Sequence, residues 1–174
     1  MAKYAVQPTG VERTFGEEEI IVSKTDLKGR ITYANDVFLR VAGFSERETI
    51  GAPHSFVRHP DMPRCVFKLL WDTIANGEEI FAYVINMAKN GDHYWVFAHV
   101  TPTFGPDGKV IGYHSNRRAP KAGQVDIVKP IYADLLAAEN QYENRKEGMA
   151  RAGEALFDLL KSKGARYDEF VFSF

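Results

Sequence analysis

Three strand-like stretches joined by two short turns restrict the fold of this chain more than any other feature of its sequence. The stretches are EEIFAYVINMAK (residues 78–89), HYWVFAHVTPTF (93–104) and VIGYHSNRR (110–118), and the segments between them are NGD and GPDGK. Asn-Gly and Asp-Gly pairs favour tight hairpin turns, because these residues adopt positive φ angles at little cost. The pattern therefore predicts an antiparallel meander of three strands.

A further hairpin is expected nearer the N-terminus. Residues 19–26 are predicted to form a strand whose β-branched residues gather at its start, and residues 31–35 form its partner after a turn at Gly29. Together with the meander, this hairpin gives five strands in two groups. The segment between the groups is too long for a turn, so we expect it to contain helices.

Three helices are predicted between the two groups of strands. The first covers residues 36–43, with Asn35 or Asp36 as its N-cap, and the second begins at Ser45 with the S-x-x-E pattern of a capping box. The third covers residues 64–76, where apolar side chains recur at intervals of three and four and share one face. The order of elements indicates an α+β fold, a five-stranded antiparallel sheet with short helices on one face.

The composition excludes several functional classes. The formal net charge of −1 leaves no electrostatic footprint for nucleic acid or for an anionic membrane surface. No apolar run approaches the roughly 20 residues of a membrane span, and the first residues lack the apolar core of a signal peptide. One cysteine permits neither an intramolecular disulfide nor a cysteine-rich zinc site. We expect a cytoplasmic protein without membrane insertion.

The chain divides into three predicted parts: a loose N-terminal arm (residues 1–18), a central domain (19–120) and a C-terminal helical extension (121–174). In the extension, residues 139–154 are highly charged and are expected to form a solvated, weakly helical connector. Pro130 is expected to be tolerated only near the first turn of a helix. The apolar residues of the extension are expected to pack on the sheet of this chain or of a second copy; they are Val128, Ile131, Tyr132, Leu135, Phe170, Phe172 and Phe174.

The central domain resembles a known family of sensory domains. The segments KTDLKGRITYANDVFLRVAGFSERETIGAPHSFVRHPDMP, KNGDHYWV and GKVIGYHSNR are similar to the FAD-binding PAS sensor domain of the bacterial aerotaxis-receptor type. The resemblance implies a PAS fold and a redox- or oxygen-sensing protein that binds FAD without a covalent bond. We expect signalling through protein contacts made by the C-terminal extension, as a homodimer or with a chemotaxis partner, and no enzymatic activity.

The resemblance also implies a set of cofactor-binding residues. Asn35, Arg58, His59, Asp61 and Asn86 match positions that the family uses to bind or retain FAD. The helix at residues 64–76 is expected to form one wall of the pocket, which makes its tryptophan a further candidate. The complete predicted set is Asn35, Arg58, His59, Asp61, Trp71 and Asn86.

The same physical chemistry favours these residue types for a flavin. Its ring requires an apolar and aromatic slot with a few fixed hydrogen-bond partners, and its phosphates favour the planar fork of an arginine. Purely structural roles are also open: a surface ion pair of Arg58 with Asp61, a helix cap at Asn35, and a backbone hydrogen bond at His59. Asn86 is harder to explain structurally, because strands disfavour asparagine.

Several residues depart from the family pattern. Ile80 stands where a tryptophan is usual, Met87 and Ala88 replace basic residues, and His114 replaces an apolar residue. These changes concern ring stacking and redox tuning rather than the fold.

Other functions remain open from the sequence. A cofactor-free PAS interaction module is the main alternative, with the pocket filled by Ile80, Phe81 and Tyr83. Haem would need His54 or His59 as its ligand, although the long helix has no histidine. A blue-light flavin domain would need Cys65 above the ring, outside any motif for that role. The five scattered histidines form no metal set. A catalytic site needs a nucleophile, a base and an orienting group, and only Cys65 with His59 could be forced into such a set.

Overall fold

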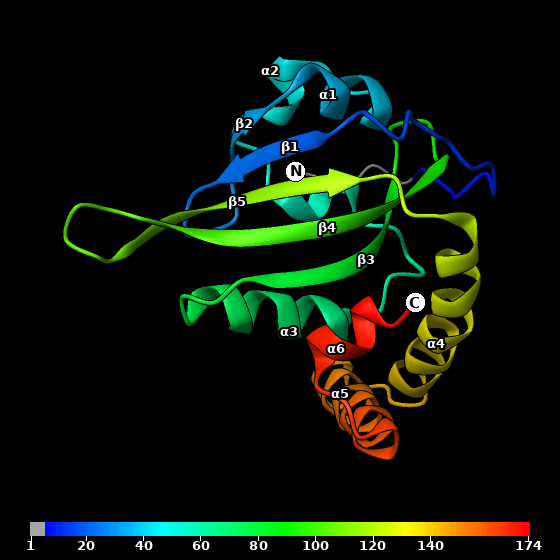
Figure 1. Cartoon of the computed structure of the whole chain (residues 1–174). Helices are drawn as coiled ribbons and strands as arrows, with labels where there is room; N and C mark the ends of the chain where they lie inside the picture. Colours follow the sequence, from blue (N-terminus) through cyan, green and yellow to red (C-terminus); the bar gives the residue numbers. More distant parts are fainter. Residues whose placement is uncertain (1–5) are drawn as a thin grey trace.

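The computed structural model describes residues 6–174 and contains one five-stranded antiparallel sheet in the order β2-β1-β5-β4-β3 (Figure 1). The three-stranded meander and the N-terminal hairpin predicted from the turns are both confirmed. The two groups join where β1 pairs with β5, with Ser23 opposite Ser115. The strands are β1 (Ile21–Thr25), β2 (Ile31–Ala34), β3 (Ile80–Met87), β4 (His93–Phe104) and β5 (Val110–Arg118).

Short helices cover one face of the sheet, as the sequence predicts. They are α1 (Asp36–Ala42), α2 (Glu46–Thr49), the 3₁₀ helix η1 (His54–Val57) and α3 (Arg64–Ala75). The Asn35 side chain caps α1 by accepting a hydrogen bond from the Phe38 amide. Ser45 and Glu48 form the predicted capping box of α2. Because α1 and α2 are each started by a local capping signal, their boundaries lie close to the predicted ones.

The two faces of the sheet carry different aromatic residues. Side chains alternate along a strand, so Val84 and Asn86 face the helices whereas Phe81 and Tyr83 face the opposite side. On this outer face Phe81 stacks on Phe97 of β4, with ring centroids 5.9 Å apart. The outer half-sheet of β3 and β4 is therefore strongly apolar and needs a cover.

The C-terminal extension supplies this cover. It consists of α4 (Ala122–Asn140), α5 (Arg145–Lys163) and α6 (Tyr167–Phe172). The Phe172 ring lies 4.7 Å from Phe81, and the Tyr132 hydroxyl donates to the backbone carbonyl of Tyr83 on β3 at 2.5 Å. Figure 1 shows α4 and α6 beside β3, and α5 below α3. The expected packing of the tail on a sheet is confirmed, and the sheet is that of the same chain.

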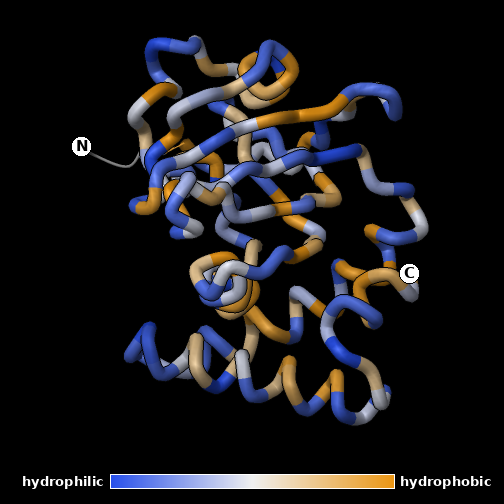
Figure 2. Tube along the Cα trace, turned by 60° about the vertical axis from the view of Figure 1, so that its left-hand side comes forward, coloured by the Kyte–Doolittle hydropathy of each residue, from blue (hydrophilic) through white to orange (hydrophobic). Residues whose placement is uncertain are grey.

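Two expectations for the extension are wrong. Pro130 lies in the middle of α4, where it removes the donor for the carbonyl of Asp126; both residues are exposed, so water can solvate that carbonyl. Most of the predicted connector at residues 139–154 belongs to α5, along which hydrophobic and hydrophilic turns alternate (Figure 2). Glu139, the first residue of the predicted connector, is fully buried at the end of α4.

The N-terminal arm is also more ordered than expected. Its first five residues lie outside the described part of the chain. The Thr9 amide donates to the carbonyl of Gly91 in the β3–β4 turn at 3.0 Å, and Arg13 forms an ion pair of 3.1 Å with Asp92. The arm is therefore held against this turn from Thr9 to Arg13.

Candidate functional site: a cationic cavity between the sheet and α3

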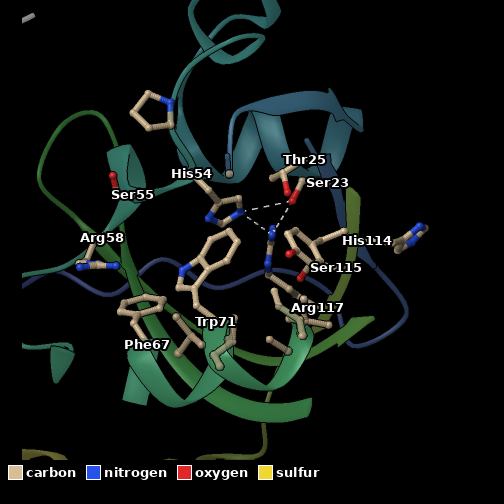
Figure 3. A pocket seen from close by; sticks show the side chains of 18 of the residues that line it. Ser23, Thr25, His54, Ser55, Arg58, Phe67, Trp71, His114, Ser115 and Arg117 are labelled. Carbon is tan, nitrogen blue, oxygen red and sulfur yellow. Dashed lines mark hydrogen bonds between the residues drawn. The ribbon is translucent and has the colours of Figure 1, made fainter. Parts of the chain in front are cut away.

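A cavity of about 260 Å³ lies between the inner face of the sheet, α3 and the segment around η1 (Figure 3). The amphipathic spacing of α3 directs Phe67, Leu70, Trp71 and Ile74 toward it. Val84, Ala98 and Val100 line the cavity from β3 and β4. The remaining lining residues, most of them polar, are Ser23, Thr25, Lys28, Gly29, Pro53, His54, Ser55, Arg58, Asn86, Tyr113, His114, Ser115 and Arg117. The cavity thus has an apolar wall and a polar side.

Trp71 is fixed by close contacts at this wall. Its indole meets the Tyr113 ring edge-on, with centroids 5.5 Å apart. It also lies against Gly29, where an added Cβ would be 2.9 Å from the indole. Gly29 has a φ of 74°, which other residues rarely adopt. The hairpin turn therefore needs glycine for two reasons, its conformation and the space occupied by Trp71.

Arg117 is the most unusual group in the cavity. It is 4% exposed on the central strand β5, and its Nη2 donates to Ser23 Oγ at 2.5 Å and to His54 Nε2 at 2.7 Å (Figure 3). Burial lowers the pKa of this guanidinium to about 10, and Tyr94 acts in the opposite direction. Among the described residues lining the cavity there is no Asp or Glu. Lys28, Arg58 and Arg117 therefore give the cavity a positive potential without a local carboxylate.

His54 is held neutral beside this arginine. Burial, and then the positive charges of Arg117 and Arg58, lower the pKa of His54 to about 3. Because a guanidinium only donates, Nε2 of His54 must be the acceptor. The nitrogen that haem ligation would require is thus already engaged by Arg117.

Three buried polar atoms of the cavity have no partner among residues 6–174. They are Thr25 Oγ1, Ser115 Oγ and Arg58 Nε. Buried polar groups are almost always hydrogen-bonded, to protein or to water, so such a cluster marks a place where a ligand or ordered water completes the structure. The cavity therefore suits a ligand with an apolar ring and several hydrogen-bonding atoms.

Three of the six predicted site residues line the cavity: Arg58, Trp71 and Asn86. The Arg58 guanidinium lies over the Phe67 ring, 4.0 Å from its centroid. Arg58 also forms an isolated antiparallel bridge with Asn86, which attaches the loop to β3. Asn86 is 3% exposed and faces the cavity from the strand interior.

The other three predicted residues lie outside the cavity lining. Asn35 has its amide satisfied by the backbone: its oxygen accepts from Val22 and Phe38, and its nitrogen donates to the Ile20 carbonyl at 2.8 Å. His59 is buried, and its Nδ1 accepts from the Asp61 amide at 3.1 Å.

The Asp61 carboxylate is largely exposed and lies 3.8 Å from that same His59 nitrogen. Within the described chain Asp61 makes no ion pair with Arg58, so the surface pair weighed from the sequence is not formed.

The sequence reasoning missed Arg117 and the polar residues around it. Ser23 and Thr25 alternate on β1, and Ser115 and Arg117 alternate on β5. Polar residues at alternating positions of two neighbouring strands could have indicated a polar patch. Which face they share becomes clear only from the pairing of β1 with β5.

Comparison with known proteins identifies the family. The chain belongs to the PAS-fold family, which matches residues 31–117. It is 39% identical over 137 residues to the aerotaxis receptor of Escherichia coli (strain K12), covering 79% of this chain and 27% of the receptor. It is 28% identical to the nitrogen fixation regulatory protein of Klebsiella pneumoniae, over 59% of this chain and 21% of that protein. The predicted resemblance is confirmed, and the chain spans about a quarter of the length of these relatives.

Solved structures support the same fold. A light-oxygen-voltage domain studied with a flavin analogue matches with a TM-score of 0.58 and 19% identity, over 71% of this chain and 90% of that one. The light-state structure of the Aureochrome1 light-oxygen-voltage domain matches with a TM-score of 0.54 and 23% identity, over 70% and 91%. The likeness concerns the fold.

Within residues 6–174, no three His, Cys, Asp or Glu side chains gather in an arrangement that could hold a metal ion. No helix of this part of the chain combines the length and apolar character needed to cross a membrane.

Proposed function

We propose that this chain is a cytoplasmic redox or oxygen sensor that binds FAD non-covalently in the cavity between the sheet and α3. It passes the state of the cofactor to a partner through protein contacts, in aerotaxis or chemotaxis, and is not an enzyme. The observation that carries the proposal is the composition of the cavity: an aromatic wall, three unpartnered polar atoms, and cations without a carboxylate. The relation to the aerotaxis receptor supports it.

The residues present fit a flavin. Trp71 and Phe67 provide an aromatic wall for the ring, and Asn86, Thr25 and Ser115 provide hydrogen-bonding groups for its edge. Arg58 would provide positive charge for the phosphates, and the buried Arg117 would provide donors for the carbonyl oxygens of the ring. When bound, a flavin supplies reversible electron transfer, and the residues named here hold the cofactor and exclude water.

The size of the cavity bears on which flavin is bound. Its volume of about 260 Å³ lies just below the roughly 300–1,000 Å³ of most ligand pockets. This space suits the ring system rather than a whole dinucleotide. The pyrophosphate and adenosine of FAD would then lie outside the enclosed part of the cavity. Since FAD and FMN differ only in this part of the molecule, residues outside the cavity would distinguish FAD from FMN.

Asn35, His59 and Asp61 remain part of the proposal, in an indirect role. Asn35 joins the strand β1 to the start of α1. His59 and Asp61 shape the loop that follows Arg58. These residues would retain the cofactor by positioning Arg58 and the helical side of the cavity, without touching the ligand themselves.

The cofactor-free alternative placed Ile80, Phe81 and Tyr83 inside the pocket. Phe81 and Tyr83 lie on the outer face, against Phe172 and Phe174, and Ile80 is buried without lining the cavity, so these residues do not support that alternative. Cys65, the residue required by a light-driven adduct, lines a separate groove between α3 and α5. Burial, the nearby Glu139 charge and its hydrogen bond raise the pKa of the Cys65 thiol to about 12, so it is not a reactive thiolate.

The test is the flavin content of purified variants. The full chain is incubated with FAD or FMN, dialysed, and measured by absorbance in the flavin bands. R58A is expected to lose about ten- to a hundred-fold in affinity, since a hydrogen bond to a charged group contributes ~1.5–3 kcal/mol, and N86A about two- to ten-fold, since a hydrogen bond between neutral groups contributes ~0.5–1.5 kcal/mol. R118A is the control for R58A, because it also removes an arginine, and Arg118 is exposed on β5 and does not line the cavity.

Circular dichroism confirms that each variant is folded. A colourless wild-type protein after incubation with either flavin would reject flavin binding. Normal flavin content in both folded variants would reject the assigned residues.

A further inference from the structure

The buried carboxylate of Glu139 connects the C-terminal extension to the wall of the cavity. Glu139 is the penultimate residue of α4 and has 0% exposure. One oxygen accepts from the backbone amide of Cys65 at 2.8 Å, and the other accepts from Arg64 Nε at 2.9 Å. Both partners belong to the first turn of α3, about 75 positions earlier in the sequence.

This contact replaces the missing N-cap of α3. Pro63 occupies the N-cap position and makes no side-chain hydrogen bond to the helix. The first amides of a helix need an acceptor, and a negative charge there is favourable because of the helix dipole. The extension therefore supplies the cap that the local sequence of α3 lacks.

The same helix carries the aromatic wall of the cavity. Phe67 and Trp71 follow Cys65 within two helical turns, and both line the cavity. Arg58 lies over Phe67 and is influenced by the same carboxylate. Burial lowers the pKa of Arg58, and the Glu139 charge acts against this shift. Glu139 thus acts on the cavity from behind its wall, both by position and by charge.

The position of Glu139 is itself fixed by α5. Gly148 packs so tightly against α4 that an added Cβ would lie 2.2 Å from the Glu139 carbonyl oxygen. The close approach of α5 therefore holds the backbone of Glu139 in place beside the start of α3. The contacts form one continuous series from α5 through Glu139 to the cavity.

We propose that Glu139 is a positioning residue for the cavity, so that its contact with the first turn of α3 and binding of the ligand stabilise each other. The proposal rests on the proposed function for the identity of the ligand, FAD. By thermodynamic linkage, the factor by which the Glu139 contact with α3 tightens ligand binding equals the factor by which the ligand favours that contact. The extension is then the segment that responds to occupancy of the cavity.

The test compares two single-site variants of the full chain. E139Q keeps an acceptor for the Cys65 amide but removes the charge shared with Arg64. Y132F removes the hydrogen bond from α4 to the Tyr83 carbonyl and leaves Glu139 unchanged. Affinity for added FAD is measured by fluorescence titration, and hydrogen exchange is followed by mass spectrometry with and without FAD.

We expect E139Q to weaken FAD binding about ten-fold or more, and Y132F to change it less than three-fold. FAD should slow exchange across residues 145–163 in the wild type and in Y132F, and much less in E139Q. Without FAD, E139Q should exchange faster than Y132F across residues 64–71. Equal FAD affinity in all three proteins, or protection by FAD that ends at α3, would overturn the proposal.

Failure of the proposed function gives a different result. If the wild type binds no FAD, flavin binding is rejected, and the exchange of residues 64–71 without ligand still decides the positioning role. Faster exchange there in E139Q alone keeps Glu139 as the residue that orders the cavity wall. Equal exchange in E139Q and Y132F rejects that role too.

Discussion

Two glycines of α5 provide a sharp test of the packing on which the extension depends. Gly148 and Gly153 lie in the same helix, and each should cost about 1 kcal/mol of helix propensity relative to alanine. Their surroundings differ completely. An added Cβ at Gly153 meets nothing within 4 Å, whereas at Gly148 it would lie 2.2 Å from the Glu139 carbonyl oxygen and 3.1 Å from its carbonyl carbon. The sequence alone would treat them alike.

The expected effects have opposite signs. G153A should raise the free energy of unfolding by about 0.5–1 kcal/mol, since it gains helix propensity without a clash. G148A gains the same propensity but forces two backbones apart, and overpacking typically costs ~1–3 kcal/mol. Loss of the Glu139 contacts with α3 adds to this cost. We expect G148A to be less stable than the wild type by about 2 kcal/mol.

Urea unfolding followed by circular dichroism measures both variants, with the wild type as reference. For a chain of this size, about 2 kcal/mol corresponds to a fall in melting temperature of roughly 4–8 °C. Because both variants replace glycine by alanine in the same helix, the change in the entropy of the unfolded chain is the same in both, and the difference in their free energies of unfolding reports on the folded state. If G148A were as stable as G153A, the close approach of α4 and α5 would not exist in solution, and the linkage through Glu139 would lose its basis.

Two further predictions concern charged groups. The pKa of His54 is lowered to about 3, so between pH 6.5 and 3 the unfolded chain binds a proton that the folded chain does not. The free energy of unfolding should therefore fall by at most about 1.4 kcal/mol per pH unit below pH 6.5. H54N should show a shallower slope, and equal slopes would refute the assignment. R64A should lower the free energy of unfolding in urea by about 3–5 kcal/mol, more than E139Q does, because it leaves the fully buried Glu139 carboxylate without its cation. Combining R64A with E139Q should recover part of this loss. A double variant no more stable than R64A would contradict this account.

The fold could be predicted because its signals are local. Gly91 in the NGD turn, the Asn35 cap and the Ser45 capping box each act within a few residues, and all three are present. The cavity residues Arg58 and Asn86 were found from a family motif and from an asparagine in a strand interior. These signals do not depend on how distant segments pack.

The rest of the site depends on contacts between distant residues. Arg117 faces the cavity because β5 pairs with β1 in one register, and a shift by one residue would turn it to the other face. Glu139 looked like part of a solvated charged run, yet its partners lie at Arg64 and Cys65. Composition predicts solvation for such a run and contains no information about a partner some 75 residues away.

The distribution of charge around the cavity limits what it can bind. Arg117 is buried, and its partners Ser23 and His54 are neutral acceptors, which leave its charge uncompensated. The nearest structural carboxylate behind the wall, Glu139, already serves Arg64 and the start of α3. A neutral apolar ligand would bury these cations further without a counter-charge, at a cost in free energy. A ligand that combines an aromatic ring with negative charge offsets that cost, so the charges on the protein discriminate among ligands that the apolar wall alone would accept.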